Sequence, residues 1–192
     1  MLYFLAGLVC LAIFFYWAKS VEKVQHAKAR SLRLNELGQL PNFASQSIHY
    51  FSANGRSAIA INESSKKIAL FERSRGWKEV DFADVLSSGP LENDSTGMEA
   101  SATDRSRSAV IGVAVFGIPG AIAGANSNLR KVRKLDLRVT IDDLHSPIWD
   151  VNFLFELSAV YSTSGKYRAA LDELTLWQSR LNATRARAAK SS

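Results

Sequence analysis

The polar residues best suited to chemistry lie close together between two hydrophobic runs, at Asp142, Asp143 and His145. Carboxylates beside an imidazole can transfer protons or hold a metal ion. Aspartate is also favoured in tight turns, where its side chain accepts hydrogen bonds from nearby backbone amides. Because Pro147 follows and the three residues separate two runs of strand character, we predict a turn here and no catalytic centre.

Other kinds of catalysis find little support in the residue pattern. The chain has one cysteine, Cys10, which lies in an apolar run, so it forms no internal disulfide and no cysteine-based zinc site. The three histidines are too far apart in sequence for a ligand pair of metal-site spacing. No Gly-x-Ser-x-Gly segment exposes a nucleophilic serine. We predict a protein without enzymatic activity, metal or cofactor, and keep an enzyme acting on lipid as a distant alternative.

Positive charge favours an anionic partner. The formal net charge is +6, and a compact basic cluster follows the most glycine-rich part of the chain, at Arg130, Lys131, Arg133 and Lys134. No aromatic residues alternate with these cations, as they do in many sites for single-stranded nucleic acid. A basic cluster beside an apolar stretch is typical of a membrane surface. We therefore expect anionic lipid headgroups, or a membrane protein, and not nucleic acid.

An apolar segment at the N-terminus predicts a membrane anchor over residues 1–18. The run from Leu2 to Ala18 is about 25 Å long as a helix, which is enough to cross a bilayer. Trp17 closes the run at the expected headgroup level. A cleaved signal peptide is disfavoured because no basic residue precedes the run and no small-x-small cleavage pattern follows it.

Basic residues follow the anchor and set its orientation. By the positive-inside rule the N-terminus should be outside and the bulk of the chain in the cytoplasm, given the cations Lys19, Lys23, Lys28, Arg30 and Arg33. Apolar residues at helical spacing predict that residues 19–40 form a basic helix beside the membrane, ending near Gly38 and Pro41. This helix serves either as a solvated stalk or as a lipid contact.

The remainder predicts a mainly β fold. Short strands separated by turns are expected at Ile48–Phe51, Ser57–Ile61, Lys67–Phe71, Trp77–Phe82, Gly89–Asn93, Leu135–Ile141 and Ile148–Phe155. In the last of these strands, alternation places Trp149, Val151, Phe153 and Phe155 on one face. An amphipathic helix follows, capped by Ser164, with the stripe Tyr167, Leu171, Leu174, Trp177 and Leu181. We predict a small antiparallel barrel or sandwich covered by this helix, over residues 43–187, with a basic disordered tail at 188–192.

The order of these elements resembles a known family. The segments SAIAINESSKKIALFER, WKEVDFADVLSSGPLEND and KLDLRVTIDDLHSPIWDVNFLF, with a glycine-rich apolar insert before the last of them, are similar to bacterial and phage proteins that carry a pleckstrin-homology-like (PH-like) domain. The resemblance implies a seven-stranded barrel with a C-terminal capping helix and a binding or scaffolding role. It implies no particular site residues. It also places the anchored protein in a bacterial inner membrane.

The insert AVIGVAVFGIPGAIAGA at residues 109–125 has no charged side chain. Its glycine spacing fits neither of the common phosphate-binding loops. If the insert crossed the bilayer completely, the strands before it and the strands after it would lie on opposite sides of the membrane. They could not then form one β-sheet. Pro119 and Gly120 interrupt the run, so we predict a helical hairpin of two short arms that either enters the inner leaflet or packs on the β domain.

Together these features predict a membrane-anchored interaction module without catalytic function. The residues expected to contact membrane or lipid are Trp17, Lys19, Lys23, Arg105, Arg107, Phe116, Pro119, Arg130, Lys131 and Arg133. An alternative is a phage-type or defence-associated factor that acts on a membrane partner, for example in excluding a second phage.

Overall fold

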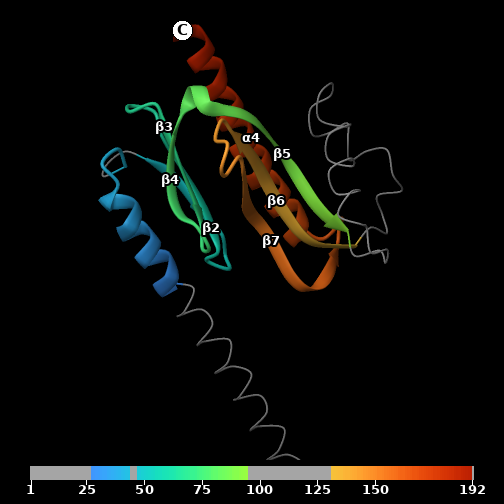
Figure 1. Cartoon of the computed structure of the whole chain (residues 1–192). Coiled ribbons are helices and arrows are strands. Elements are labelled where there is room, and N and C mark those ends of the chain that lie inside the picture. Colours follow the sequence, from blue (N-terminus) through green and yellow to red (C-terminus); the bar gives the residue numbers. More distant parts are fainter. Residues whose placement is uncertain (1–26, 44–46, 95–130, 192) are drawn as a thin grey trace, which may run out of the picture.

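The computed structural model describes residues 27–43, 47–94 and 131–191 (Figure 1). Residues 27–39 are helical, within the stretch predicted as a basic helix. The β elements follow as β1 (Ile48–Phe51), β2 (Ser57–Asn62), β3 (Lys67–Glu72), β4 (Gly76–Asp81), the 3₁₀ turn η1 (Phe82–Asp84), β5 (Val85–Asp94), β6 (Lys131–Ile141) and β7 (Ile148–Tyr161). The last element is the helix α4 (Gly165–Ser191).

The first sheet is an antiparallel meander in the order β1-β2-β3-β4. Its hairpins form where the sequence predicts turns, and Gly55 and Gly76 adopt positive φ in two of them. The large side chains Ile59 and Ile61 of β2 belong to the main core, whereas Ala60 packs in a second cluster with Leu37 and Phe43. Both faces of this sheet are therefore covered: one by the rest of the β domain and one by helix 27–39 (Figure 1).

The second sheet has the order β5-β6-β7 and carries a β-bulge that the sequence does not reveal. Leu135 pairs with Leu154 but Asp136 pairs with Asn152, so Phe153 is an extra residue on β7. Beyond the bulge the alternation reverses, because one extra residue exchanges the two faces of a strand. Leu154 is buried and Phe155 is exposed. The prediction that Phe155 lies on the same face as Trp149 and Val151 is therefore wrong.

The C-terminal helix has the predicted stripe. Tyr167, Leu174, Trp177 and Leu181 are buried in the main core, with Leu171 packed against them. The hydroxyl of Ser164 accepts a hydrogen bond from the backbone N–H of Tyr167 at 3.3 Å, as expected for an N-terminal cap. The helix extends to Ser191, through residues 188–191 that the sequence predicted as a disordered tail.

The two sheets do not join into a closed barrel within the described residues. Backbone ladders connect β1 to β4 and β5 to β7, and none connects the two groups. Side chains link them instead, since Arg75 and Lys78 reach from β4 and the turn before it to β7 and the loop ahead of it. Of the two predicted forms, barrel and sandwich, the two-sheet form is observed.

The structure leaves the predicted membrane anchor untested. No helix in the described part of the chain combines the length and the apolar character needed to span a bilayer. The anchor at residues 1–18 and the insert at 109–125 lie outside the described residues.

A buried polar network joins the sheets at the bulge. The backbone N–H of Asn152 donates to the hydroxyl of Ser57 at 2.8 Å, and its side-chain amide donates to Asp136 at 2.7 Å. Lys134 lies 2.5 Å from the other carboxylate oxygen of Asp136. Loss of hydration on burial raises the pKa of Asp136 above its usual value, although Asn152 and Lys134 act in the opposite direction.

Replacement of Leu174 by alanine tests the packing of α4. Leu174 is completely buried, so Leu174→Ala should lower the free energy of unfolding by about 2–5 kcal/mol. Leu176 is 45% exposed on the same helix, and Leu176→Ala should cost much less. Chemical denaturation followed by circular dichroism measures both. Equal losses would contradict this packing.

The raised pKa of Asp136 predicts a pH dependence of stability. Since the pKa is higher in the folded state, this carboxyl favours folding below its unfolded pKa, and the gain disappears as pH rises through the folded pKa. The Asp136→Asn variant lacks this titration but keeps an acceptor for Asn152. The stability of the natural protein relative to Asp136→Asn should therefore fall over the pH range that begins near 3.8, the usual pKa of this side chain, and extends above it. Urea unfolding across this range measures the difference, and a rise would show that the ion pair with Lys134 dominates.

Candidate anion-binding surface

Helix 27–39 is fixed to the outer face of the first sheet. Leu37 and Phe43 are buried against Ala60 and Ala69, whose small side chains allow close approach. The guanidinium of Arg33 lies 4.2 Å from the centre of the Phe71 ring. The indole N–H of Trp77 donates to Glu36 at 3.2 Å. The direction of the helix relative to the sheet is thus set by both apolar and polar contacts.

The first described turn of this helix meets the turn between β1 and β2. A Cβ atom on Gly55 would lie 3.4 Å from the Cβ of Ala29, and Gly55 has a φ of +63°. The positive φ favours glycine at this position, and the distance places the turn in van der Waals contact with the helix. The β1–β2 turn is therefore held beside the beginning of the described helix.

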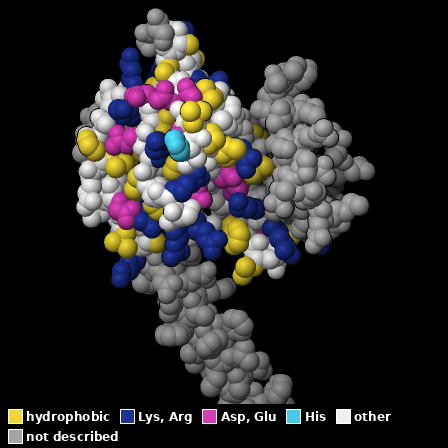
Figure 2. Space-filling model, viewed as in Figure 1, with side chains coloured by type: hydrophobic (Ala, Val, Ile, Leu, Met, Phe, Trp, Pro, Cys, Tyr) yellow, Lys and Arg dark blue, Asp and Glu magenta, His cyan; other side chains and the backbone are white. Residues whose placement is uncertain are grey.

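The turn between β3 and β4 lies at the same end. The backbone N–H of Arg73 donates to the carbonyl of Arg56 at 2.8 Å, which joins the two turns. Helix and turns together expose five cations, which we name the basic end: Lys28, Arg30, Arg56, Arg73 and Arg75. Figure 2 shows Lys and Arg side chains over the lower part of the face of the molecule turned to the viewer.

A groove lies between the helix and the β1–β2 turn. Its volume is about 450 Å³, and Arg30 and Arg33 contribute its charged lining. Apolar and small residues form the rest, including Phe51, Ala53 and Ser57. Cations above an apolar floor could hold a group with an anionic head and an apolar part.

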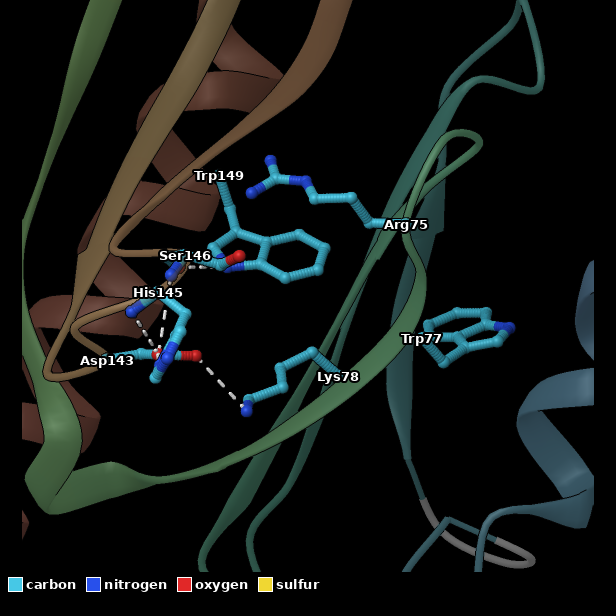
Figure 3. Close-up of a pocket in the computed structure, with 7 residues that line it drawn as sticks. All are labelled: Arg75, Trp77, Lys78, Asp143, His145, Ser146 and Trp149. Atoms are coloured by element: carbon cyan, nitrogen blue, oxygen red, sulfur yellow. Dashed lines mark hydrogen bonds and ion pairs between the residues drawn. The ribbon is translucent and has the colours of Figure 1, made fainter.

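A second pocket of about 450 Å³ lies between the two sheets (Figure 3). Arg75 stacks on Trp149, 4.0 Å from the ring centre, and donates to the carbonyl of Ile148 at 3.0 Å. Lys78 lies 3.2 Å from Asp143. We name this pocket the inter-sheet cleft.

The loop beside this cleft is the predicted turn. The carboxylate of Asp143 accepts hydrogen bonds from the backbone N–H groups of His145 at 2.9 Å and Ser146 at 3.3 Å. The His145 amide, followed by Lys78, holds the pKa of Asp143 below its usual value. Asp143 therefore has a structural role in the turn, as the sequence predicted for the Asp142, Asp143 and His145 group. In the part of the chain that the structure covers, no group of acidic, histidine or cysteine residues could hold a metal ion.

The cations of the inter-sheet cleft and those of the basic end differ in their availability to a ligand. In the inter-sheet cleft, Lys78 is paired with Asp143, and Arg75 is paired with Glu72. An anion entering there must compete with these carboxylates. Within the described residues, no ion pair engages the other four members of the basic end, Lys28, Arg30, Arg56 and Arg73. The basic end is therefore the better site for an anionic surface.

Most residues predicted to contact lipid lie outside the described residues. These are Trp17, Lys19, Lys23, Arg105, Arg107, Phe116, Pro119 and Arg130. Lys131 and Arg133 are exposed on β6, so this strand begins before the predicted Leu135. Arg56, Arg73 and Arg75 were not among the predicted residues. Their signal was available, because the first and third turns of an antiparallel meander lie at the same end of the sheet.

Two antiparallel sheets followed by a helix define this part of the chain as a PH-like domain. Residues 46–155 match the family described as glycine zipper containing PH domain. This match covers more than half of the 192 residues, so the chain belongs to that family. The predicted PH-like domain with a glycine-rich region is confirmed, and such a domain indicates an interaction module. No curated protein and no solved structure shows significant similarity to the chain.

Removal of the Asp143 carboxylate should loosen the loop at the inter-sheet cleft. Asp143→Ala removes the acceptor for two backbone amides and the partner of Lys78, so the amides of His145 and Ser146 should exchange with solvent several-fold faster. Asp142→Ala is the control, because its exposed side chain takes no part in these bonds. Hydrogen exchange measures the effect. Equal rates in both variants would contradict this role of Asp143.

Proposed function

We propose that this protein is a membrane-anchored interaction module without catalytic function, whose PH-like domain contacts anionic lipid through the basic end. Residues 1–18 span the bilayer, with the N-terminus outside and the domain in the cytoplasm, and the membrane is a bacterial inner membrane. Trp17, Lys19 and Lys23 lie at the headgroups that border the span. Arg105, Arg107 and Arg130 flank the apolar insert, whose Phe116 and Pro119 contact the bilayer.

The strongest support for this function comes from the position of the basic end. Lys28 and Arg30 lie near the beginning of the described helix, the part closest in sequence to the proposed anchor. The turns that carry Arg56 and Arg73 lie beside it. A rigid helix that leads from the membrane would therefore hold these arginines toward the headgroups. Each basic residue close to an anionic surface contributes about 1 kcal/mol of attraction.

Hydrogen exchange of the full chain in lipid nanodiscs tests this contact. Backbone amides in the turns at residues 52–56 and 73–75 should exchange more slowly in discs of phosphatidylcholine with phosphatidylglycerol than in discs of phosphatidylcholine alone. The double variant Arg56→Glu, Arg73→Glu should abolish the difference. Loss of about 1 kcal/mol for each arginine is roughly a fivefold change in the population of the contact.

Charge reversal at the far end of the molecule is the matched control. Arg185 and Lys190 are exposed near the C-terminal end of α4, which Figure 1 shows opposite the turns of the basic end. The double variant Arg185→Glu, Lys190→Glu should keep the protection in anionic discs. Equal exchange in the two kinds of disc would contradict lipid binding. Protection only in native membranes that contain their proteins would favour a membrane protein partner instead.

A further inference from the structure

The second half of β7 exposes large apolar side chains in close succession. Leu157 is 86% exposed, and Phe155 and Tyr161 are each 48% exposed. Residues 151–154 of the same strand are buried. We name these three residues the apolar end of β7.

The bulge at Phe153 explains why Phe155 and Leu157 are exposed. It turns Leu154 into the core and Phe155 to the opposite face, where Phe155 is aligned with Lys134 of β6. A second irregularity follows, after which Val160 packs against the core and Tyr161 is exposed beside Lys131. An apolar group of this kind on an outer strand is a liability in water and often marks a contact surface.

Basic and aromatic groups accompany the apolar end. Lys131 and Arg133 are exposed on the neighbouring strand β6, and the ammonium of Lys131 lies 5.2 Å from the centre of the Tyr161 ring. Aromatic, aliphatic and cationic side chains together are typical of proteins that enter the boundary between lipid headgroups and acyl chains. The charge of this surface is complementary to an anionic bilayer.

The connection between β5 and β6 also favours a membrane as the partner of the apolar end. Residues 95–130 leave β5 after Asp94 and return at Lys131, directly beside the apolar end. That segment includes the uncharged apolar run 109–125. Figure 1 also shows the last part of β7 at the same end of the domain as the β3–β4 turn and the beginning of helix 27–39. One flat surface could therefore meet the basic end and the apolar end together.

We infer that the apolar end of β7 is a second membrane contact, in which Phe155, Leu157 and Tyr161 enter the headgroup–acyl boundary while Lys131 and Arg133 meet anionic headgroups. This inference rests on the proposed function, because it requires the domain to lie at a membrane. It adds that the second sheet also touches the bilayer. The domain then lies on the membrane through both sheets and has one fixed orientation.

A fluorescent probe on the full chain tests the depth of Leu157. The chain with Cys10→Ser and Leu157→Cys is labelled with a nitrobenzoxadiazole group and reconstituted in vesicles of phosphatidylcholine and phosphatidylglycerol. Lipids brominated on the acyl chain should quench this probe several-fold more than a probe introduced by Leu144→Cys. Leu144 is the matched control, since it is 97% exposed in the loop between β6 and β7. Neither exposed position should disturb folding.

The outcomes distinguish failure of this inference from failure of the proposed function. Equal quenching at positions 144 and 157, in vesicles that retain the protein, would overturn this inference and leave the basic end untouched. A shielded probe at 157 that brominated lipid does not quench, and whose shielding depends on the ratio of protein to lipid, would show a second copy of the chain on this surface and also overturn it. Failure of the chain to remain with vesicles would refute the proposed function itself.

Discussion

The burial of the first sheet on both faces is the constraint on which the rest of the structure depends. Every residue of β2 is buried, with Ile59 and Ile61 in the main core and Ala60 toward helix 27–39. The difference in size matters because a helix can approach a sheet closely only over small side chains. Consequently the helix is part of the folded domain and not a free stalk. The orientation of this helix therefore fixes the orientation of the β domain packed on it.

The bulge in β7 resolves a second constraint, which arises where the two sheets meet without a backbone ladder. At this junction the N–H of Asn152 would be buried without a partner, and the hydroxyl of Ser57 accepts its hydrogen bond. The hydroxyl of Tyr50 likewise donates to the carbonyl of Asn152 at 3.1 Å, and its ring stacks on Phe153. The extra residue that allows these contacts also reverses the faces of β7. One local feature thus satisfies the polar groups between the sheets and exposes the apolar side chains farther along.

Features that depend on neighbouring residues could be predicted from the sequence, and those that depend on distant contacts could not. The hairpin turns, the Asp143 turn and the stripe of α4 follow from local residue preferences and periodicity. The β-bulge has no local signal, since it is set by the partners Ser57 and Asp136 in other strands. For the same reason the true lengths of β6 and β7 were missed. The basic end was missed because its residues come from three segments, although the alternation of hairpin turns was sufficient to place two of them together.

Charge pairing distinguishes the places where an anion could bind. In the inter-sheet cleft the cations Lys78 and Arg75 are already paired with Asp143 and Glu72, so they stabilise the junction of the sheets. A bilayer does not require a deep pocket, since its headgroups form an extended surface that attracts exposed cations. The basic end has this character, and the apolar end of β7 supplies the contact that electrostatics alone lacks, because burial of apolar surface is far less sensitive to salt. A domain that combines both contacts would stay oriented at ionic strengths that weaken the charges alone.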